Sequence, residues 1–169
     1  MSVKHQGFGL VVVSVLSVLA AAATAQAPEA EPASEAPHVM LTPAEMEWAP
    51  IGSLPPGAMA SVVEGDLAQE GFFAARLKLP ANYRIPPHFH PAVERVTVLQ
   101  GTFQLGMGDA FDEAALEAFE PGSYLSMPIG SRHFAATGDE EVIVQLASIG
   151  PWGITYVNPA DDPRQAAAE

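Results

Sequence analysis

Short apolar runs, interrupted about every ten residues, dominate the chain from residue 59 to residue 159. Each run is rich in β-branched and aromatic residues, and Gly, Pro, Asp or Asn separates it from the next. The runs are MASVVEGD, GFFAARLKLP, ERVTVLQGTFQLGMGD, GSYLSMPIG, RHFAATG, EEVIVQLASIG and GITYVNP. The 16 prolines and 14 glycines of the chain argue against a helical bundle. The pattern predicts an all-β fold, an antiparallel sandwich or barrel.

Two details of this pattern make local predictions. In the run at 94–109, the pair Gln100-Gly101 is expected to join two strands. The helix-like stretch FDEAALEAF, residues 111–119, is short and lies between strands. We therefore expect a helical turn in a loop there, not a core helix.

The first residues of the chain have the pattern of an export signal. Lys4 and His5 precede an apolar run over residues 8–25, which ends in Ala23-Thr24-Ala25, an A-x-A cleavage pattern. The alternative is an uncleaved membrane anchor, for which the strongly apolar part, about 16 residues, is short. The sequence predicts a signal peptide at 1–25, cleaved after Ala25, and a periplasmic or secreted protein.

Composition divides the remaining chain into three parts. Residues 26–45 are rich in Ala, Pro and Glu and read as a flexible linker. The β-barrel domain is expected at 46–160, followed by a C-terminal tail at 161–169. The total of 169 residues suits one domain.

The charge balance excludes some partners. The chain has 20 acidic and 7 basic residues, a net charge of -13, without a basic cluster. Nucleic acid and anionic membrane surfaces both require clustered Lys and Arg, so neither is expected as a partner. No cysteine is present for disulfides. A small-molecule ligand and a second copy of the chain remain the expected partners. GFFAARLKLP and Trp152 are candidates for a dimer contact, and Trp48 and Trp152 could cover either the barrel or a dimer interface.

The stretch PPHFHPAVE, residues 86–94, gathers residue types that bind transition metals. On a strand, His88 and His90 point to the same face and Phe89 points away. Glu94 follows close enough to reach the same point after a bend, and the flanking prolines stiffen the backbone. Alone, these residues fit either a metal site or a polar patch on a solvated strand.

A second stretch, GSYLSMPIGSRHF at 122–134, strengthens the metal hypothesis. Together the two stretches resemble the two motifs of the cupin superfamily, G-x5-HxH-x3,4-E-x6-G and G-x5-PxG-x2-H-x3-N. The matching residues are His88, His90, Glu94, Gly101, Gly122, Pro128, Gly130 and His133. The resemblance covers roughly residues 58 to 157 and implies a small jelly-roll β-barrel.

Two positions depart from the motifs. Asn82 stands where the first motif has Gly, and Thr137 where the second has Asn. Asn tolerates a positive φ better than most residues, so we expect the turn at Asn82 to be kept.

The resemblance implies that His88, His90, Glu94 and His133 bind one divalent transition-metal ion. Three imidazoles and a carboxylate suit Fe, Mn, Ni, Cu or Zn and suit Ca or Mg poorly. The alternative is a hydrogen-bonded polar cluster in a metal-free barrel. The sequence identifies no catalytic residue beside these four.

The function stays open among three classes. The chain fits a small metalloenzyme with dioxygenase, isomerase or lyase chemistry, a non-catalytic module that binds a small molecule or metal, and a barrel with a structural metal. Polar candidates for a substrate contact are Tyr83, Arg84 and Gln145. Apolar candidates for the pocket wall are Phe103, Met107, Met127, Phe134 and residues 142–146.

Overall fold

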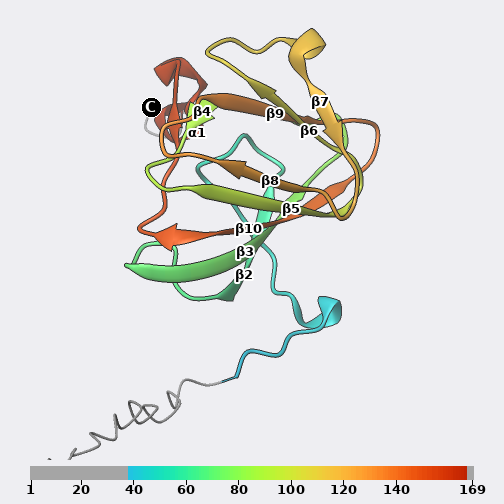
Figure 1. Ribbon diagram of the computed structural model, residues 1–169, viewed down its shortest axis with the longest axis vertical. Helices are drawn as coiled ribbons and strands as arrows, with labels where there is room; N and C mark the ends of the chain where they lie inside the picture. Colours follow the sequence, from blue (N-terminus) through green and yellow to red (C-terminus); the bar gives the residue numbers. More distant parts are fainter. Residues whose placement is uncertain (1–37, 167–169) are drawn as a thin grey trace, which may run out of the picture. The chain divides into compact units, whose positions relative to one another are not determined.

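The computed structural model describes residues 38–166, which form two antiparallel β-sheets packed face to face (Figure 1). The first sheet contains, in spatial order, β1 (Ala49–Pro50), β2 (Met59–Glu64), β3 (Gly71–Leu79), β10 (Val142–Gly150), β5 (Glu94–Gln100) and β8 (Tyr124–Met127). The second contains β11 (Thr155–Tyr156), β4 (Arg84–Phe89), β9 (His133–Thr137), β6 (Phe103–Met107) and β7 (Glu117–Phe119). The prediction of an all-β fold is confirmed.

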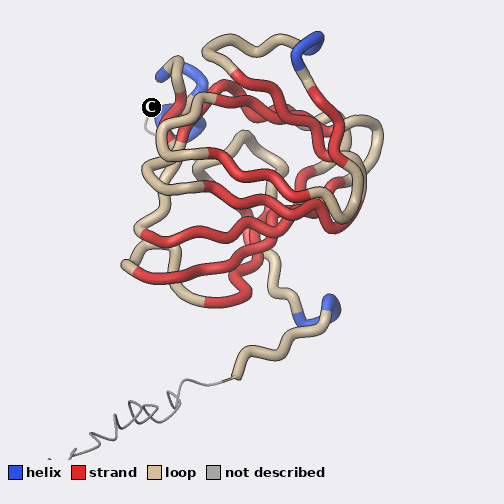
Figure 2. The backbone as a smooth tube through the Cα atoms, viewed as in Figure 1, coloured by secondary structure: helices blue, strands red, loops and turns tan. Residues whose placement is uncertain are grey.

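Helices in the described part of the chain are single turns, and strands make up most of the regular structure (Figure 2). They are the 3₁₀ turns η1 (Pro43–Glu45), η2 (Glu113–Ala115) and η3 (Pro159–Asp161) and the short helix α1 (Pro163–Ala166). Between residues 38 and 166 we find no helix with the length and apolar character that a membrane crossing requires.

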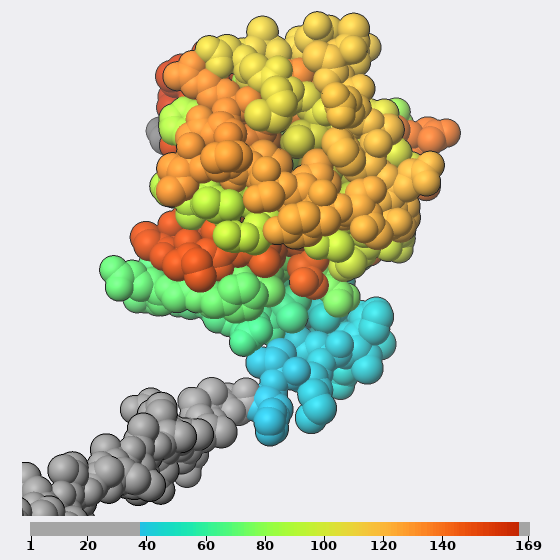
Figure 3. Space-filling model, in the orientation of Figure 1, coloured from blue at the N-terminus to red at the C-terminus, as the bar shows by residue number. Residues whose placement is uncertain are grey.

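Strand alternation builds the core between the two sheets. In β10, Val142, Val144 and Leu146 are buried, and the residues between them are only half-buried. In β5, Val96 and Val98 are buried in the same way. The apolar side chains that face inward from both sheets form one cluster, which gives the sandwich its core. In the space-filling view, β2 and β3 (green) lie along one side and the loop with η2 (yellow) lies at the opposite side (Figure 3).

The turn at Gln100-Gly101 is present, but it is not a hairpin. Gly101 has φ +69°, in the region that favours glycine. The strands on either side, β5 and β6, belong to different sheets. The turn therefore carries the chain from one sheet to the other.

The prediction for residues 111–119 is only half right. Residues 113–115 form the expected helical turn, η2. Residues 117–119 form β7, which pairs with β6 in the register Phe103↔Phe119 and Leu105↔Glu117. Residues 117–119 can pair with the edge of β6 through backbone hydrogen bonds. In so short a segment this pairing stabilises the strand more than helix propensity stabilises a helix.

Contacts with the barrel are made by Met46, the first residue of the predicted domain, and by Arg164 in the predicted tail. In the range predicted as linker, Glu45 and Thr42 cap η1. The hydroxyl of the buried Ser61 donates to the sulfur of Met46 at 3.6 Å. In the range predicted as tail, Arg164 donates to the carbonyl of Ile154 at 3.1 Å. The predicted signal peptide, 1–25, and residues 26–37 of the predicted linker lie outside the described residues.

Candidate metal centre

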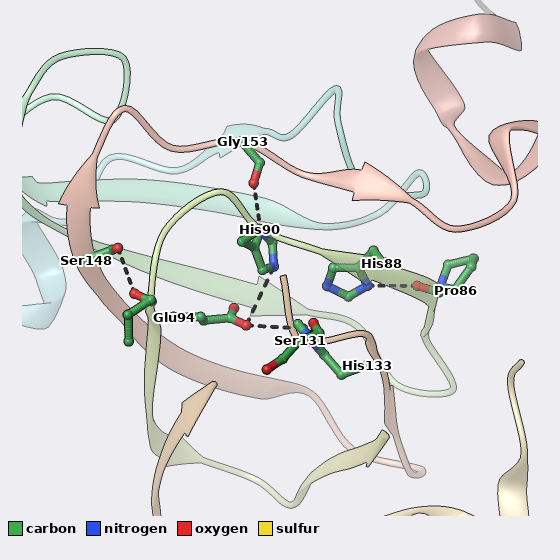
Figure 4. A network of polar contacts seen from close by, with 9 residues as sticks. Pro86, His88, His90, Glu94, Ser131, His133, Ser148 and Gly153 are labelled. Atoms are coloured by element: carbon green, nitrogen blue, oxygen red, sulfur yellow. Dashed lines mark hydrogen bonds and ion pairs between the residues drawn. The ribbon is translucent and has the colours of Figure 1, made fainter. Parts of the chain in front are cut away.

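Three buried histidines converge between the two sheets (Figure 4). His88 lies on β4, His90 follows the end of that strand, and His133 begins β9, where it pairs with His88. One ring nitrogen from each lies within 4.8 Å of the others. The prediction that His88 and His90 share a face is confirmed. Phe89, half-buried, lies instead 5.9 Å from the guanidinium of Arg132.

Glu94 approaches this group from the opposite sheet. It is the first residue of β5 and is buried. Its Oε2 atom lies 3.5 Å from Nε2 of His90 and 3.1 Å from Nε2 of His133. The fold thus brings together all four residues that the cupin motifs single out.

Backbone carbonyls fix the orientation of all three imidazoles. Nδ1 of His88 lies 2.7 Å from the carbonyl of Pro86, and Nδ1 of His133 lies 3.0 Å from that of Ser131. Nδ1 of His90 lies 2.7 Å from the carbonyl of Gly153. A carbonyl only accepts, so each Nδ1 carries the hydrogen, and a neutral ring keeps its lone pair on Nε2. Metal-binding histidines in proteins are usually held in this way.

This arrangement brings hydrogen-bond acceptors together in a buried space. Nε2 of His90 and Oε2 of Glu94 are buried without a hydrogen-bond partner among residues 38–166. Two acceptors at such distances repel unless a cation or a proton lies between them. A divalent ion would satisfy all four residues, so the donor set fits a transition metal.

The protonation states also suit a cation. Burial, together with the nearby His133 and His90, lowers the pKa of His88 to about 3. Burial likewise lowers the pKa of His90. Burial disfavours the charged forms of Glu94 and His133, but their mutual contact outweighs it, lowering the pKa of Glu94 and raising that of His133. At neutral pH the site holds a carboxylate and at least two neutral imidazoles.

The two motifs hold each other in place. The amide of Gly130, in the second motif, donates to the carbonyl of His90 in the first at 3.0 Å. Gly130 has φ +74°, which a side chain would strain. The hydroxyl of Ser148 on β10 donates to the carbonyl of Val93 at 2.7 Å, which fixes the backbone next to Glu94.

Asn82 and Thr137, the two residues that depart from the motifs, both fit the local backbone structure. Asn82 has φ +56°, so the prediction that Asn adopts the positive φ of this turn is confirmed. Thr137 is buried, and its hydroxyl donates to the carbonyl of Pro80 at 2.6 Å and accepts from the amide of Tyr83 at 2.9 Å. Thr137 therefore ties β9 to the turn that leads into β4.

A cavity of about 340 Å³ adjoins the four residues. Aliphatic and aromatic side chains of both sheets form most of its wall, among them Leu77, Val96, Phe103, Met127, Val144 and Leu146. The prediction is confirmed for Phe103, Met127, Val144 and Leu146. It is wrong for Met107, which is 56% exposed, and for Phe134, which packs against Phe111. Val142 and Ile143, from the run 142–146, do not line this cavity either.

The three predicted polar contacts lie elsewhere. The hydroxyl of Tyr83 donates to the carbonyl of Pro55, Arg84 pairs with Glu113 in solvent, and Gln145 alternates with the inward residues of β10. A register shift between Ile85 and His88 explains the error at Arg84. With strict alternation, Arg84 would share the face of His88, but the bulge places Ile85 in the cavity wall instead.

The polar and aromatic groups that do line the cavity include Ser53, Trp152 and Arg164. Trp152 stacks on His90, with ring centres 4.1 Å apart and planes at 18°. Trp152 therefore forms part of the cavity wall beside the candidate ligands. Arg164 falls in the predicted tail, and no local pattern marks it in the sequence.

Comparisons with known proteins agree with this fold. Residues 36–152 match the family described as the ChrR Cupin-like domain. Among curated proteins, none matches this chain.

Several solved structures are similar in fold. The polyketide cyclase RemF from Streptomyces resistomycificus is 18% identical, with a TM-score of 0.60 over 77% of this chain and 92% of that chain. An RmlC-like cupin from Ralstonia eutropha is 19% identical, with a TM-score of 0.56 over 73% and 74%. The DMSP lyase DddQ from Ruegeria pomeroyi is 22% identical, with a TM-score of 0.51 over 63% and 57%. The family match covers most of the chain, and the protein therefore belongs to the cupin superfamily, in the ChrR Cupin-like family.

Proposed function

We propose that this cupin binds one divalent transition-metal ion through His88, His90, His133 and Glu94, and that it is a small metalloenzyme acting on a small oxygen-bearing molecule. One observation carries the proposal. Three imidazoles, each oriented by a carbonyl at Nδ1, present their Nε2 atoms beside a buried carboxylate. Such a set of acceptors is best satisfied by a metal ion.

The ligand types favour Fe, Mn, Ni, Cu or Zn. When bound, such an ion supplies Lewis-acid or redox chemistry toward an oxygen-bearing group, as dioxygenases, isomerases and lyases require. The buried carboxylate of Glu94 would balance the positive charge of such an ion. The stacking of Trp152 on His90 holds one imidazole in its orientation.

The cavity favours an enzyme or binding module over a purely structural metal. Its volume, about 340 Å³, lies within the range of small-molecule sites, about 300–1,000 Å³. Its wall is mainly apolar, and its polar side chains are those of the four candidate ligands, Ser53 and Arg164. An apolar body would bind to the wall while an oxygen-bearing end faces the histidines.

Metal binding is tested by loading metal-free protein with Fe(II), Mn(II), Ni(II), Cu(II) and Zn(II) in turn, followed by elemental analysis. We expect about one ion per chain for at least one metal. His133→Ala should lose most of this binding, since His133 is the ligand that the second motif contributes. His38→Ala is the matched control, because His38 is exposed and remote in sequence from both motifs. A wild-type protein that takes up none of the five metals would refute the proposal.

Melting curves separate a catalytic metal from a structural one. Bound metal stabilises the folded state by mass action, so a structural ion should raise the melting temperature strongly. His133→Ala would then melt as low as the metal-free wild type. With a catalytic ion, the variant should stay folded at working temperature and lose turnover in screens of oxygen-bearing substrates. A metal-loaded protein without turnover on any of them would favour the non-catalytic binding module.

We also propose that the protein is exported and that residues 1–25 are removed. The support is the basic start, the short apolar run and Ala23-Thr24-Ala25. N-terminal sequencing of protein recovered from the exported fraction should begin at Gln26. Recovery of chains that still begin with Met1 would contradict this prediction.

A further inference from the structure

Arg164 is the unexpected member of the cavity wall. Glu94 and Arg164 are the charged side chains among the described residues that line this cavity, apart from the titratable histidines. Glu94 belongs to the candidate metal centre, and Arg164 comes from the segment after η3. The Arg164 side chain is 47% exposed, so Arg164 places one solvent-accessible cation in a wall that is otherwise mainly apolar.

The guanidinium of Arg164 is held firmly on one edge. Nε donates to Oδ1 of Asp162 at 2.7 Å, and Nη2 donates to Oδ2 of the same carboxylate at 2.7 Å. Nη2 also donates to the carbonyl of Ile154 at 3.1 Å. A bidentate pair of this kind fixes the plane of the group.

These contacts leave one nitrogen available. A guanidinium has five N–H groups, and Nε and Nη2 account for three. The other two, on Nη1, donate to no residue between 38 and 166. They are charged donors held in a fixed plane, which makes a ligand oxygen with negative charge their preferred partner.

The net negative charge of the chain makes a donor group for anions in the cavity wall unusual. With 20 acidic and 7 basic residues, the protein repels an anionic ligand at long range. Asp162 already pairs with the charge of Arg164, so what the cavity wall offers an anion is the two N–H donors of Nη1. The two N–H groups of Nη1 can each donate to an oxygen, and a carboxylate is the smallest anionic group that offers two acceptor oxygens.

We propose that Arg164 recognises a carboxylate at one end of the substrate, while the apolar wall binds its body. This inference rests on the proposed function in one respect: the opposite end of the substrate is taken to carry the oxygen that faces the histidines. Arg164 is a specificity-determining residue, and Asp162 positions it. The substrate class is therefore a small carboxylic acid with a second, remote oxygen function.

The first experiment needs no metal. Isothermal titration calorimetry of the full metal-free chain compares linear carboxylates, from butanoate to decanoate, with the primary amides of the same length. At the best length we expect the carboxylate to bind about tenfold more tightly than the amide. Arg164→Gln should abolish this preference, and Arg164→Lys, which keeps the charge without the planar fork, should retain only part of it.

Arg84→Gln is the matched control. It removes the same charge from an arginine that also pairs with a carboxylate, Glu113, in solvent. This variant should keep the tenfold preference. Equal binding of carboxylates and amides at every length would overturn the proposal. So would a preference that persists in Arg164→Gln, because the carboxylate would then bind elsewhere.

A second experiment separates this inference from the proposed function. Metal-loaded protein is titrated with hydroxamic acids that end in a carboxylate or in a carboxamide, over the same range of lengths. Loading with metal should strengthen binding of both, and Arg164 should add the carboxylate preference. A carboxylate preference without any gain from metal would refute the metal proposal and support the role of Arg164.

Discussion

One backbone hydrogen bond at Nδ1 decides that each of the three histidines presents Nε2 to the site. Because Nδ1 of His88, His90 and His133 each donates to a carbonyl, rotation of a ring would break a buried hydrogen bond. The cost of orienting the ligands is therefore met when the chain folds. A metal then binds to rings that are already oriented.

The pKa of His88 makes the stability of the metal-free protein depend on pH. The folded ring binds a proton only near pH 3, and the unfolded ring does so near 6.5. Between these two pH values the unfolded state binds a proton at residue 88 and the folded state does not. The contribution of His88 to the free energy of unfolding is therefore fully present above pH 6.5 and is lost as pH falls toward 3. We expect His88 to contribute a slope of up to about 1.4 kcal/mol per pH unit.

Urea unfolding of metal-free protein between pH 6.5 and about 5, above the range where carboxylates titrate, measures this slope. His88→Gln should have a flatter dependence, because the substituted side chain does not titrate. His38→Gln, altered at an exposed histidine, should keep the wild-type slope. Parallel curves for the wild type and His88→Gln would contradict the prediction.

Motif spacing was sufficient to find the four candidate ligands, because it reflects backbone geometry that recurs throughout a superfamily. It could not find Arg164 or Ser53. Both reach the cavity from segments that are distant in sequence, and their placement depends on tertiary packing. A contact of this kind leaves no periodic pattern in the chain.

At the scale of elements, β4 shows how one irregularity redirects a strand. Its central residues, Pro86 and Pro87, have no amide hydrogen to donate to a ladder. The register with β9 shifts there, between Ile85 and His88. The existence of short strands was predictable from the sequence pattern, but this change of face in β4 was not, and it turns Arg84 away from the cavity.

The pairing of β6 with β9 depends on a missing side chain. Gly106 lies opposite Phe134, and a Cβ at Gly106 would overlap the ring of Phe134, which is fully buried. Gly106→Ala should therefore lower the free energy of unfolding by about 1–3 kcal/mol. Denaturant unfolding provides the measurement.

Two further variants isolate this contact. Gly138→Ala should be nearly neutral, because a Cβ at Gly138 meets nothing within 4 Å. Phe134→Leu in the Gly106→Ala background should recover part of the loss, since the smaller side chain relieves the overlap. Strictly additive effects of Gly106→Ala and Phe134→Leu would show that the ring is not the cause.

At the scale of the whole molecule, the first sheet exposes apolar side chains that a second copy is suited to cover. Phe72 on β3 and Ile149 on β10 pair across the strands and are 52% and 55% exposed. Leu99 on β5 is 40% exposed. We propose a homodimer through this face. Phe72 belongs to GFFAARLKLP, the segment that the sequence suggests for a dimer contact.

Light scattering at micromolar concentration should give the mass of a dimer. Ile149→Lys should give a monomer, because a charge in the centre of an apolar contact is costly to bury. Ile129→Lys, at an isoleucine that is 65% exposed in the loop after β8, should remain dimeric. A wild-type monomer mass would count against the proposal.

The segment at 152–154 belongs to both the candidate metal centre and the cavity wall. The carbonyl of Gly153 orients His90, while Trp152 and Ile154 line the cavity. A guest molecule that displaces this segment must change the affinity of the histidines for their ion. Thermodynamic reciprocity then requires the ion to change the affinity for the guest by the same factor. Any such displacement would couple occupancy of the cavity to occupancy of the metal site through three consecutive residues.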